Sequence, residues 1–206
     1  LIYGGKPTNA WEATLAECAA WEPAHVSCYG LTYEAGTLFG ERADEALDDD
    51  KALELFHLAQ TRLRAYRRYE VSNFARTGQE CRHNLIYWHN EEYAGFGPGA
   101  YSYLGRERLR NVASIDGYLS DPFAIEERIR ISDHEERLET VIQHMRLADG
   151  LEKAYYAARF GSEVRADFSD ALDKLLAWGL IGENEARLWP TEAGFDLNNE
   201  IGLALA

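Results

Sequence analysis

The sequence predicts an α/β fold, in which βα units with a mainly parallel sheet are followed by a small winged-helix-like α+β module. In the first half, short runs of β-forming residues alternate with segments of helical length, which is the pattern of parallel βα units. From about residue 133 the pattern changes to helical segments and one hairpin. We therefore expect two domains, residues 1–125 and residues 126–206.

The first half opens with an apolar, strand-like run at residues 1–3. Asn9 precedes a helical segment at residues 10–21, and Glu12 follows three residues later, so the pair predicts a capping box. Three consecutive aspartates, residues 48–50, open a second helix to about residue 66, because their charge suits a helix N-terminus. The other elements expected here are strands at residues 25–29, 69–72 and 93–97 and a loop at residues 30–40.

In the second half, apolar residues at helical spacing predict helices at residues 135–148, 152–160 and 169–178. A Gly-Glu-Asn-Glu turn then joins two short strands, residues 180–181 and 187–189, and a last helix follows Thr191. Three helices and a hairpin are the elements of a winged-helix-like module.

The composition is that of a folded protein. Its 206 residues are 46% apolar and 27% charged, which differs from the low hydrophobicity of disordered chains. No run reaches the roughly 18 to 20 apolar residues of a membrane span, and the first residues lack a secretory pattern. We expect no membrane span and a cytoplasmic location. The net charge of −14 would repel phosphate backbones and argues against a nucleic-acid partner.

The cysteines Cys18, Cys28 and Cys81 are widely spaced and contain no Cys-x-x-Cys motif. Their spacing predicts free thiols of a reducing compartment, and neither a disulfide framework nor a zinc or iron-sulfur site. Four histidines do not cluster with carboxylates at metal-binding spacing and are expected to be solvated or structural: His25, His57, His134 and His144.

The densest group of reactive side chains is residues 81–89, with the sequence Cys-Arg-His-Asn-Leu-Ile-Tyr-Trp-His. Imidazole and thiolate groups can ligate haem iron, arginine can pair with propionates, and tyrosine and tryptophan offer flat faces to a macrocycle. These residue types predict a haem contact. The alternative is a structural loop, in which His83 and Asn84 bond to backbone groups while Tyr87 and Trp88 fill the core.

A second group consists of the glycine-containing loops that follow the expected strands, at residues 4–5, 30–32 and 97–99, together with Ser72 and Asn73. In a barrel of parallel strands such loops build the active site, so a small nucleotide-like ligand would bind there. The alternative is that these glycines are ordinary turn residues.

Five motifs in this order resemble the oxygen-independent coproporphyrinogen III oxidase-like radical SAM proteins. The motifs are Leu1-Ile-Tyr-Gly, Tyr29-Gly-Leu-Thr-Tyr-Glu-x-Gly-Thr, Tyr69-Glu-Val-Ser-Asn-Phe-Ala-Arg, Glu80-Cys-Arg-His-Asn-x-x-Tyr-Trp and Gly97-Pro-Gly-Ala. Within this family they look like the haem chaperone branch, HemW, rather than the decarboxylating oxidases, HemN. The resemblance extends over nearly the whole chain.

The resemblance implies a TIM-like radical SAM barrel followed by a winged-helix-like C-terminal domain. It also implies S-adenosylmethionine (SAM) bound at a 4Fe-4S cluster, which the family holds with a Cys-x3-Cys-x2-Cys motif near the start of the barrel. That motif does not occur in this sequence. We therefore expect the chain to correspond to the second part of the barrel, residues 1–125, and the C-terminal domain, without cluster ligands.

The same resemblance implies site residues. His83, Asn84, Tyr87 and Trp88 match the His-Asn-x-x-Tyr-Trp motif associated with haem binding, and His83 is the candidate iron ligand. SAM contacts would fall at Ile2, Thr32 and Tyr101. Two departures bear on these assignments. Gly5-Lys6-Pro7-Thr8-Asn9 stands where the family has Leu-Pro-Gly-Gln-Thr, and Tyr101 stands where the branch commonly has histidine.

Three functions stay open at this point. The first is a haem chaperone that binds haem and passes it to an acceptor protein. The second is an enzyme that decarboxylates the propionates of coproporphyrinogen III with a 5′-deoxyadenosyl radical, which requires the cluster. The third is a fragment without activity, because half a parallel barrel leaves a strand edge unpaired. A homodimer also stays open.

Overall fold

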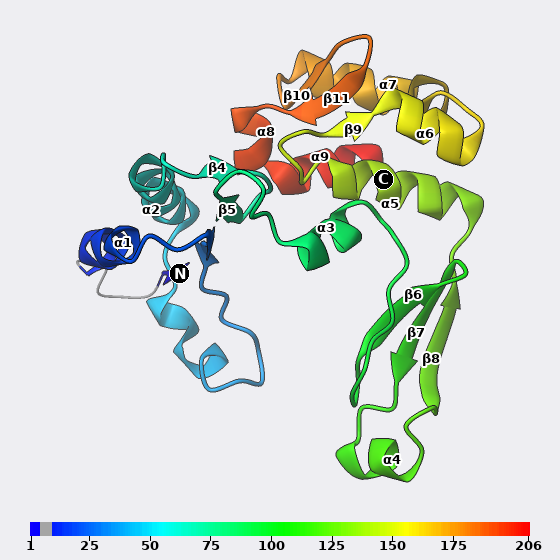
Figure 1. Ribbon diagram of the computed structural model, residues 1–206, viewed down its shortest axis with the longest axis horizontal. Coiled ribbons are helices and arrows are strands. Elements are labelled where there is room, and N and C mark those ends of the chain that lie inside the picture. Colours follow the sequence, from blue (N-terminus) through cyan, green and yellow to red (C-terminus); the bar gives the residue numbers. More distant parts are fainter. Residues whose placement is uncertain (5–9) are drawn as a thin grey trace. The chain divides into compact units, whose positions relative to one another are not determined.

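The computed structural model describes residues 1–4 and 10–206. The chain forms two compact units, Leu1–Cys81 and Arg82–Ala206 (Figure 1). The boundary expected at residues 125/126 falls inside the second unit and stays a prediction about domains. Asn9, the expected N-cap, lies outside the described residues, and Ala10 precedes the helix without a side-chain cap.

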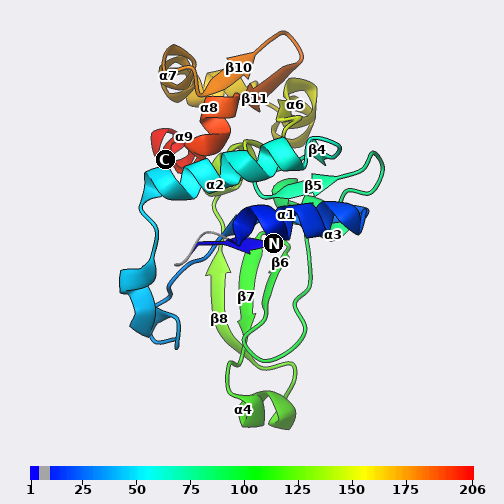
Figure 2. The ribbon, with the colours of Figure 1, turned by 90° about the vertical axis from the view of Figure 1, so that its left-hand side faces the viewer.

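The first unit contains two long helices, α1 (Trp11–Ala20) and α2 (Asp49–Arg62), which lie side by side (Figure 2). Both agree with the sequence prediction. Asp48 caps α2 by accepting a hydrogen bond from the Lys51 backbone N–H at 2.8 Å. Apolar side chains of the two helices meet those of the strands in one buried cluster, which includes Leu15, Cys28, Leu63 and Phe74.

The strands of the first unit are short. They are β1 (Ile2–Tyr3), β2 (His25–Ser27), β3 (Tyr29–Gly30), β4 (Arg67–Arg68) and β5 (Asn73–Ala75). A 3-10 helix, η1 (Gly40–Glu45), begins at the last residue of the loop expected at residues 30–40. Strand β1 pairs with β3 in parallel, as predicted. Strands β2, β5 and β4 form an antiparallel sheet in that order, so the mainly parallel sheet that the sequence predicts is not what the described residues form.

The strand predicted at residues 69–72 is wrong. These residues make the connection between β4 and β5, and side-chain bonds to the backbone hold it: Arg68 donates to the carbonyl of Val71 at 2.7 Å, and Glu70 accepts from the Ser72 N–H at 3.0 Å. Tyr69 is nevertheless buried. The β-forming residues of this run are partly buried in a turn. A short buried turn and a short strand can have the same sequence pattern, so periodicity does not distinguish them.

The second unit begins with the short helix α3 (Arg82–Trp88) and continues into an antiparallel ribbon of β6 (Tyr101–Leu104), β7 (Glu107–Asn111) and β8 (Ile125–Arg130). Helix α4 (Ile115–Ser120) lies at one end of this ribbon (Figure 1). The strand predicted at residues 93–97 is wrong, because only Tyr93 forms an isolated bridge there, with Tyr103. Asn111 Nδ2 holds the carbonyls of Gly95 and Gly97 in a loop instead.

The rest of the unit is the winged-helix-like module. Its helices are α5 (Asp133–His144), α6 (Lys153–Phe160), α7 (Val164–Ala177), α8 (Glu192–Asp196) and α9 (Asn198–Leu205), and its strands are β9 (Leu151–Glu152), β10 (Ile181–Glu183) and β11 (Arg187–Pro190). The three helices and the β10–β11 hairpin agree with the prediction. Strand β9 adds to the hairpin as a third strand.

Local signals in the sequence account for the helix ends of this module. Ser132 and Glu135 form a capping box at the start of α5. Gly161 adopts a left-handed conformation at the end of α6 (φ +68°), which glycine accepts without steric cost. Thr191 accepts a hydrogen bond from the Gly194 N–H at the start of α8. The core between these elements includes Val141, Tyr156, Leu175 and Leu188.

None of the helices in residues 1–4 and 10–206 is long and apolar enough to cross a membrane.

Replacing Leu188 with alanine should destabilise the module by about 3 kcal/mol, since the side chain is fully buried and its loss leaves a cavity. Denaturant unfolding followed by circular dichroism measures the change. Leu203→Ala is the control, because Leu203 is 72% exposed on α9 and its truncation should change the unfolding free energy by less than about 0.5 kcal/mol. Equal effects of the two substitutions would contradict the described core.

Candidate functional site

The motif expected to contact haem lies on α3, a seven-residue helix, and not on a loop. The helix ends in a Schellman arrangement: the Asn90 N–H bonds to the carbonyl of Tyr87 at 3.0 Å, and the Glu91 N–H bonds to that of Ile86 at 3.0 Å. Asn90 takes the left-handed conformation this ending requires, with φ +52°. Asparagine tolerates that conformation better than most residues, which is why the helix stops here.

The helix brings two of the four motif residues into contact. His83 and Tyr87 are one turn apart, with 3.1 Å between His83 Nε2 and the Tyr87 hydroxyl oxygen. Their rings meet edge to face at 4.9 Å, and the Tyr87 ring meets that of Tyr93 in the same way at 4.6 Å. His83 is exposed and both tyrosines are half-buried. The result is a row of aromatic rings that ends in an exposed imidazole.

Trp88 is held differently. The guanidinium carbon of Arg146, just after α5, lies 4.6 Å from the centre of its ring, so one face of the indole is covered by a cation. Trp88 Nε1 is buried and has no hydrogen-bond partner among the described residues. Asn84 occupies the same side of α3 one turn earlier and is half-buried. This part of the motif belongs to the packing of α3 against its own unit.

The carboxyl end of α3 is fixed by residues that sequence reasoning missed. Arg159 of α6 donates to the carbonyl of Asn90 at 2.9 Å and to that of His89 at 3.3 Å. Its Nη2 also bonds to Glu136 of α5 at 2.9 Å. The Tyr155 hydroxyl donates to the His89 carbonyl at 3.3 Å. The sequence signal for these contacts is weak, since Arg159 and Glu136 look like ordinary charged positions on helix surfaces.

His144, expected to be solvated or structural, is structural. It is buried, its Nδ1 lies 2.8 Å from the Thr140 carbonyl, and its ring stacks on that of His89 with centres 5.4 Å apart. Burial lowers the pKa of His144 to about 4. His25 in the first unit bonds to the Tyr69 hydroxyl at 3.0 Å, and burial lowers its pKa. His57 and His134 are exposed.

The three residues expected at SAM lie in different units. In the first unit, Ile2 is in β1 and Thr32 follows β3, and the carboxyl ends of these two parallel strands lie together. The Leu31 N–H bonds to the Tyr3 carbonyl at 2.7 Å there, and Gly4 has φ +120°. Tyr101 begins β6 in the second unit, with the Arg110 guanidinium carbon 5.7 Å from its ring centre. The SAM assignment stays a prediction.

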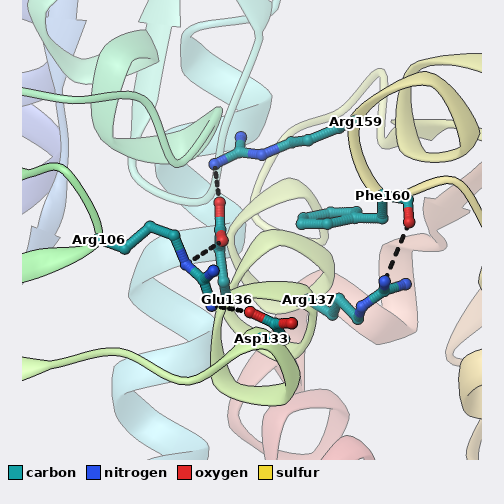
Figure 3. Close-up of a pocket in the computed structure, with 6 residues that line it drawn as sticks. All are labelled: Arg106, Asp133, Glu136, Arg137, Arg159 and Phe160. Carbon is teal, nitrogen blue, oxygen red and sulfur yellow. Dashed lines mark hydrogen bonds and ion pairs between the residues drawn. The ribbon is translucent and has the colours of Figure 1, made fainter.

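A polar pocket of about 200 Å³ is lined in part by Arg159 and Glu136, the pair that contacts the carboxyl end of α3 (Figure 3). Its lining residues are Arg106, Asp133, Glu136, Arg137, Arg159 and Phe160. Each of the three guanidinium groups is paired with a carboxylate: Arg106 with Asp133 and Glu136, Arg137 with Asp167, and Arg159 with Glu136. The charges of the pocket walls therefore compensate one another.

The cysteines do not assemble into a metal site. Cys18 and Cys28 are buried in the core of the first unit, and burial raises the pKa of the Cys28 thiol to about 11, which disfavours the thiolate that a metal needs. In the part of the chain that the structure describes, no three side chains of His, Cys, Asp or Glu lie close enough together to hold a metal ion.

Comparison with known proteins finds similarity to one group of proteins. Residues 131–197 match the model of the HemN C-terminal domain. The chain is 28% identical to the heme chaperone HemW of Bacillus subtilis over 98% of its own length and 56% of that protein. It is 30% identical to heme chaperone HemW of Lactococcus lactis over 86% of its own length and 49% of that protein. The chain thus spans about half the length of these curated relatives.

A solved structure shows the same fold. The coproporphyrinogen III oxidase HemN of Escherichia coli, described as a radical SAM enzyme, superposes with a TM-score of 0.79 at 18% identity. The match covers the whole of this chain and 53% of that protein.

Acidification should weaken the second unit through His144. Its pKa is about 4 in the folded chain and 6.5 as a free group, so the unfolded state takes up a proton first as the pH falls. The stability that the neutral imidazole contributes is complete above pH 6.5 and is lost towards pH 4, by on the order of 2–3 kcal/mol. Urea unfolding at pH 7.0, 5.5 and 4.5 measures this loss of unfolding free energy. His144→Gln should have a smaller loss over this range, and identical pH slopes for the two proteins would contradict the assignment.

Proposed function

Because the chain belongs to the oxygen-independent coproporphyrinogen III oxidase-like radical SAM family, with HemW chaperones among its relatives, we propose that it is the haem-binding part of a haem chaperone. In this role it binds haem and delivers it to an acceptor protein. The observation that supports the proposal most directly is the exposed imidazole of His83 at the end of an aromatic row on α3.

We propose His83 as the iron ligand. A histidine that ligates iron usually has its second ring nitrogen held by a hydrogen bond, which fixes the tautomer and the plane of the ring. In His83 that partner is the Tyr87 hydroxyl, 3.1 Å from Nε2, so Nδ1 is the nitrogen left for the iron. In this arrangement Tyr87 orients the His83 imidazole. The other two motif residues, Asn84 and Trp88, lie on the adjoining side of the helix.

The haem is cargo in this proposal, whereas SAM and the 4Fe-4S cluster would be resident cofactors. Cys18 and Cys28 are buried among apolar side chains, and Cys81 stands alone near α3, so the residues present do not fit the cluster. We propose that Ile2, Thr32 and Tyr101 contact SAM in the complete protein, as the family resemblance suggests.

The second reading is an oxygen-independent coproporphyrinogen III oxidase, which would decarboxylate propionates. The similarity to the E. coli oxidase is one of fold, at 18% identity. The curated relatives that cover nearly the whole chain bear the chaperone name, which favours the haem chaperone. We further propose a cytoplasmic location and a protein acceptor, with no role for nucleic acid in view of the net charge of −14.

A hemin titration followed in the Soret region tests the proposal. Wild type should show saturable binding, and His83→Ala should weaken it by at least about tenfold, the equivalent of about 1.4 kcal/mol for a lost iron bond. Tyr87→Phe keeps the ring but removes the hydroxyl, so it should weaken binding by a smaller factor and alter the Soret position. Trp88→Ala reports on the packed side of the motif.

His57→Ala is the matched control, because His57 is likewise an exposed histidine on a helix but lies on α2. It should bind hemin as wild type does. Equal binding by wild type and His83→Ala, or no saturable binding by wild type, would refute the assignment of the haem site to α3.

A further inference from the structure

The position of α3 depends on contacts made by other elements of its unit. A helix of seven residues is too short to be stable by itself in water, because the cost of nucleation is not recovered over so few hydrogen bonds. None of the seven residues is fully buried, so the helix is not held by a deeply inserted side chain. Its orientation therefore depends on its contacts with the helices beside it, which include specific bonds at its carboxyl end.

Arg159 donates two of the hydrogen bonds at this end of α3. The last carbonyls of a helix have no partner within the helix, and the helix dipole places partial negative charge on them. The Arg159 guanidinium donates to the carbonyls of the two residues that directly follow α3, His89 and Asn90. The Arg159 side chain is 22% exposed, which limits the screening of these bonds by water.

Arg159 is itself held in place. Glu136 of α5 accepts from Arg159 at 2.9 Å, and its other oxygen lies 2.9 Å from Arg106 Nε (Figure 3). The Arg159 Nη1 also donates to the Tyr155 hydroxyl at 2.7 Å. The guanidinium is therefore fixed between α5 and α6 and presents its remaining N–H groups to the end of α3.

Arg137, which lines the same pocket, holds partners other than the residues that follow α3. Arg137 donates to the carbonyl of Phe160 at 3.0 Å and pairs with Asp167 at 2.7 Å. Both guanidinium groups lie over the Phe160 ring, at 5.1 Å for Arg137 and 5.3 Å for Arg159. Arg137 is thus similar in burial, charge and surroundings, and differs in the partners that it holds.

We propose that Arg159 is a positioning residue: it locks the carboxyl end of α3 to the winged-helix-like module and so sets the direction in which the His83–Tyr87 pair faces its ligand. Glu136 acts through Arg159 by fixing the guanidinium. The proposal rests on the proposed haem site for its effect on binding, but the anchoring of α3 can be measured without haem.

Two experiments on the full chain distinguish the anchoring of α3 from its effect on haem binding. Both compare Arg159→Met and Arg159→Lys with Arg137→Met. Hydrogen exchange without haem follows the amides of residues 85–91. Arg159→Met should speed exchange there by at least about tenfold, because the end of α3 opens more often. Arg159→Lys should give an intermediate rate, since one ammonium group cannot span two carbonyls in a fork. Arg137→Met should leave these amides unchanged.

The second experiment repeats the hemin titration and records the spectrum of bound haem. Arg159→Met should weaken binding several-fold and shift the Soret maximum, whereas Arg137→Met should change neither, even if its melting temperature falls as far. If wild type binds no hemin, the proposed function fails while the exchange rates still test the anchor. Unchanged exchange at α3 in Arg159→Met, or equal effects of the two methionine variants on exchange and spectrum, would overturn the proposal.

Discussion

The charged bonds at the carboxyl end of α3 are the constraint on which the candidate site depends. The helix contributes the imidazole and the aromatic row, but at seven residues it cannot hold a direction in space by itself. Glu136 and Arg159 hold it, aided by the hydrogen bond from Asn90 Nδ2 to the Thr140 hydroxyl oxygen at 3.1 Å. A site for a flat, rigid ligand requires such a fixed direction, because a misaligned imidazole forms a poor bond to the metal.

The module behind α3 has the properties that such an anchor needs. Its core joins helices α5, α6, α7 and α9 to a three-stranded sheet, and its helix ends are capped by Ser132, Gly161 and Thr191. Elements with satisfied ends and a dense core open rarely, so bonds attached to them keep their geometry. Helix α3 is thus kept in a fixed orientation by its bonds to the well-packed helices α5 and α6.

Prediction from sequence succeeded where a residue's role is decided by its near neighbours in the chain. The helix that ends at Gly161 and the β10–β11 hairpin are of this kind. It failed at residues 69–72 and 93–97, where turn geometry set by Glu70 and Asn111 decides the outcome. Strands β7 and β8 were missed because their charged residues conceal the alternation that marks a strand. The motif on α3 was found through its resemblance to a family, whereas Arg159 could not be found, because its partners are backbone carbonyls some 70 positions away.

The charged sequence of β8 has one more consequence. Within the described residues β8 pairs with β7 on one side, all six of its residues are exposed, and its register shifts near Asn111. A flat, apolar strand in that position would offer a template for other chains to pair with. The glutamates and arginines of β8, which are Glu126, Glu127, Arg128 and Arg130, together with a break in register, make such pairing unfavourable. The residues that hide this strand from sequence analysis therefore also protect the protein from edge-to-edge aggregation.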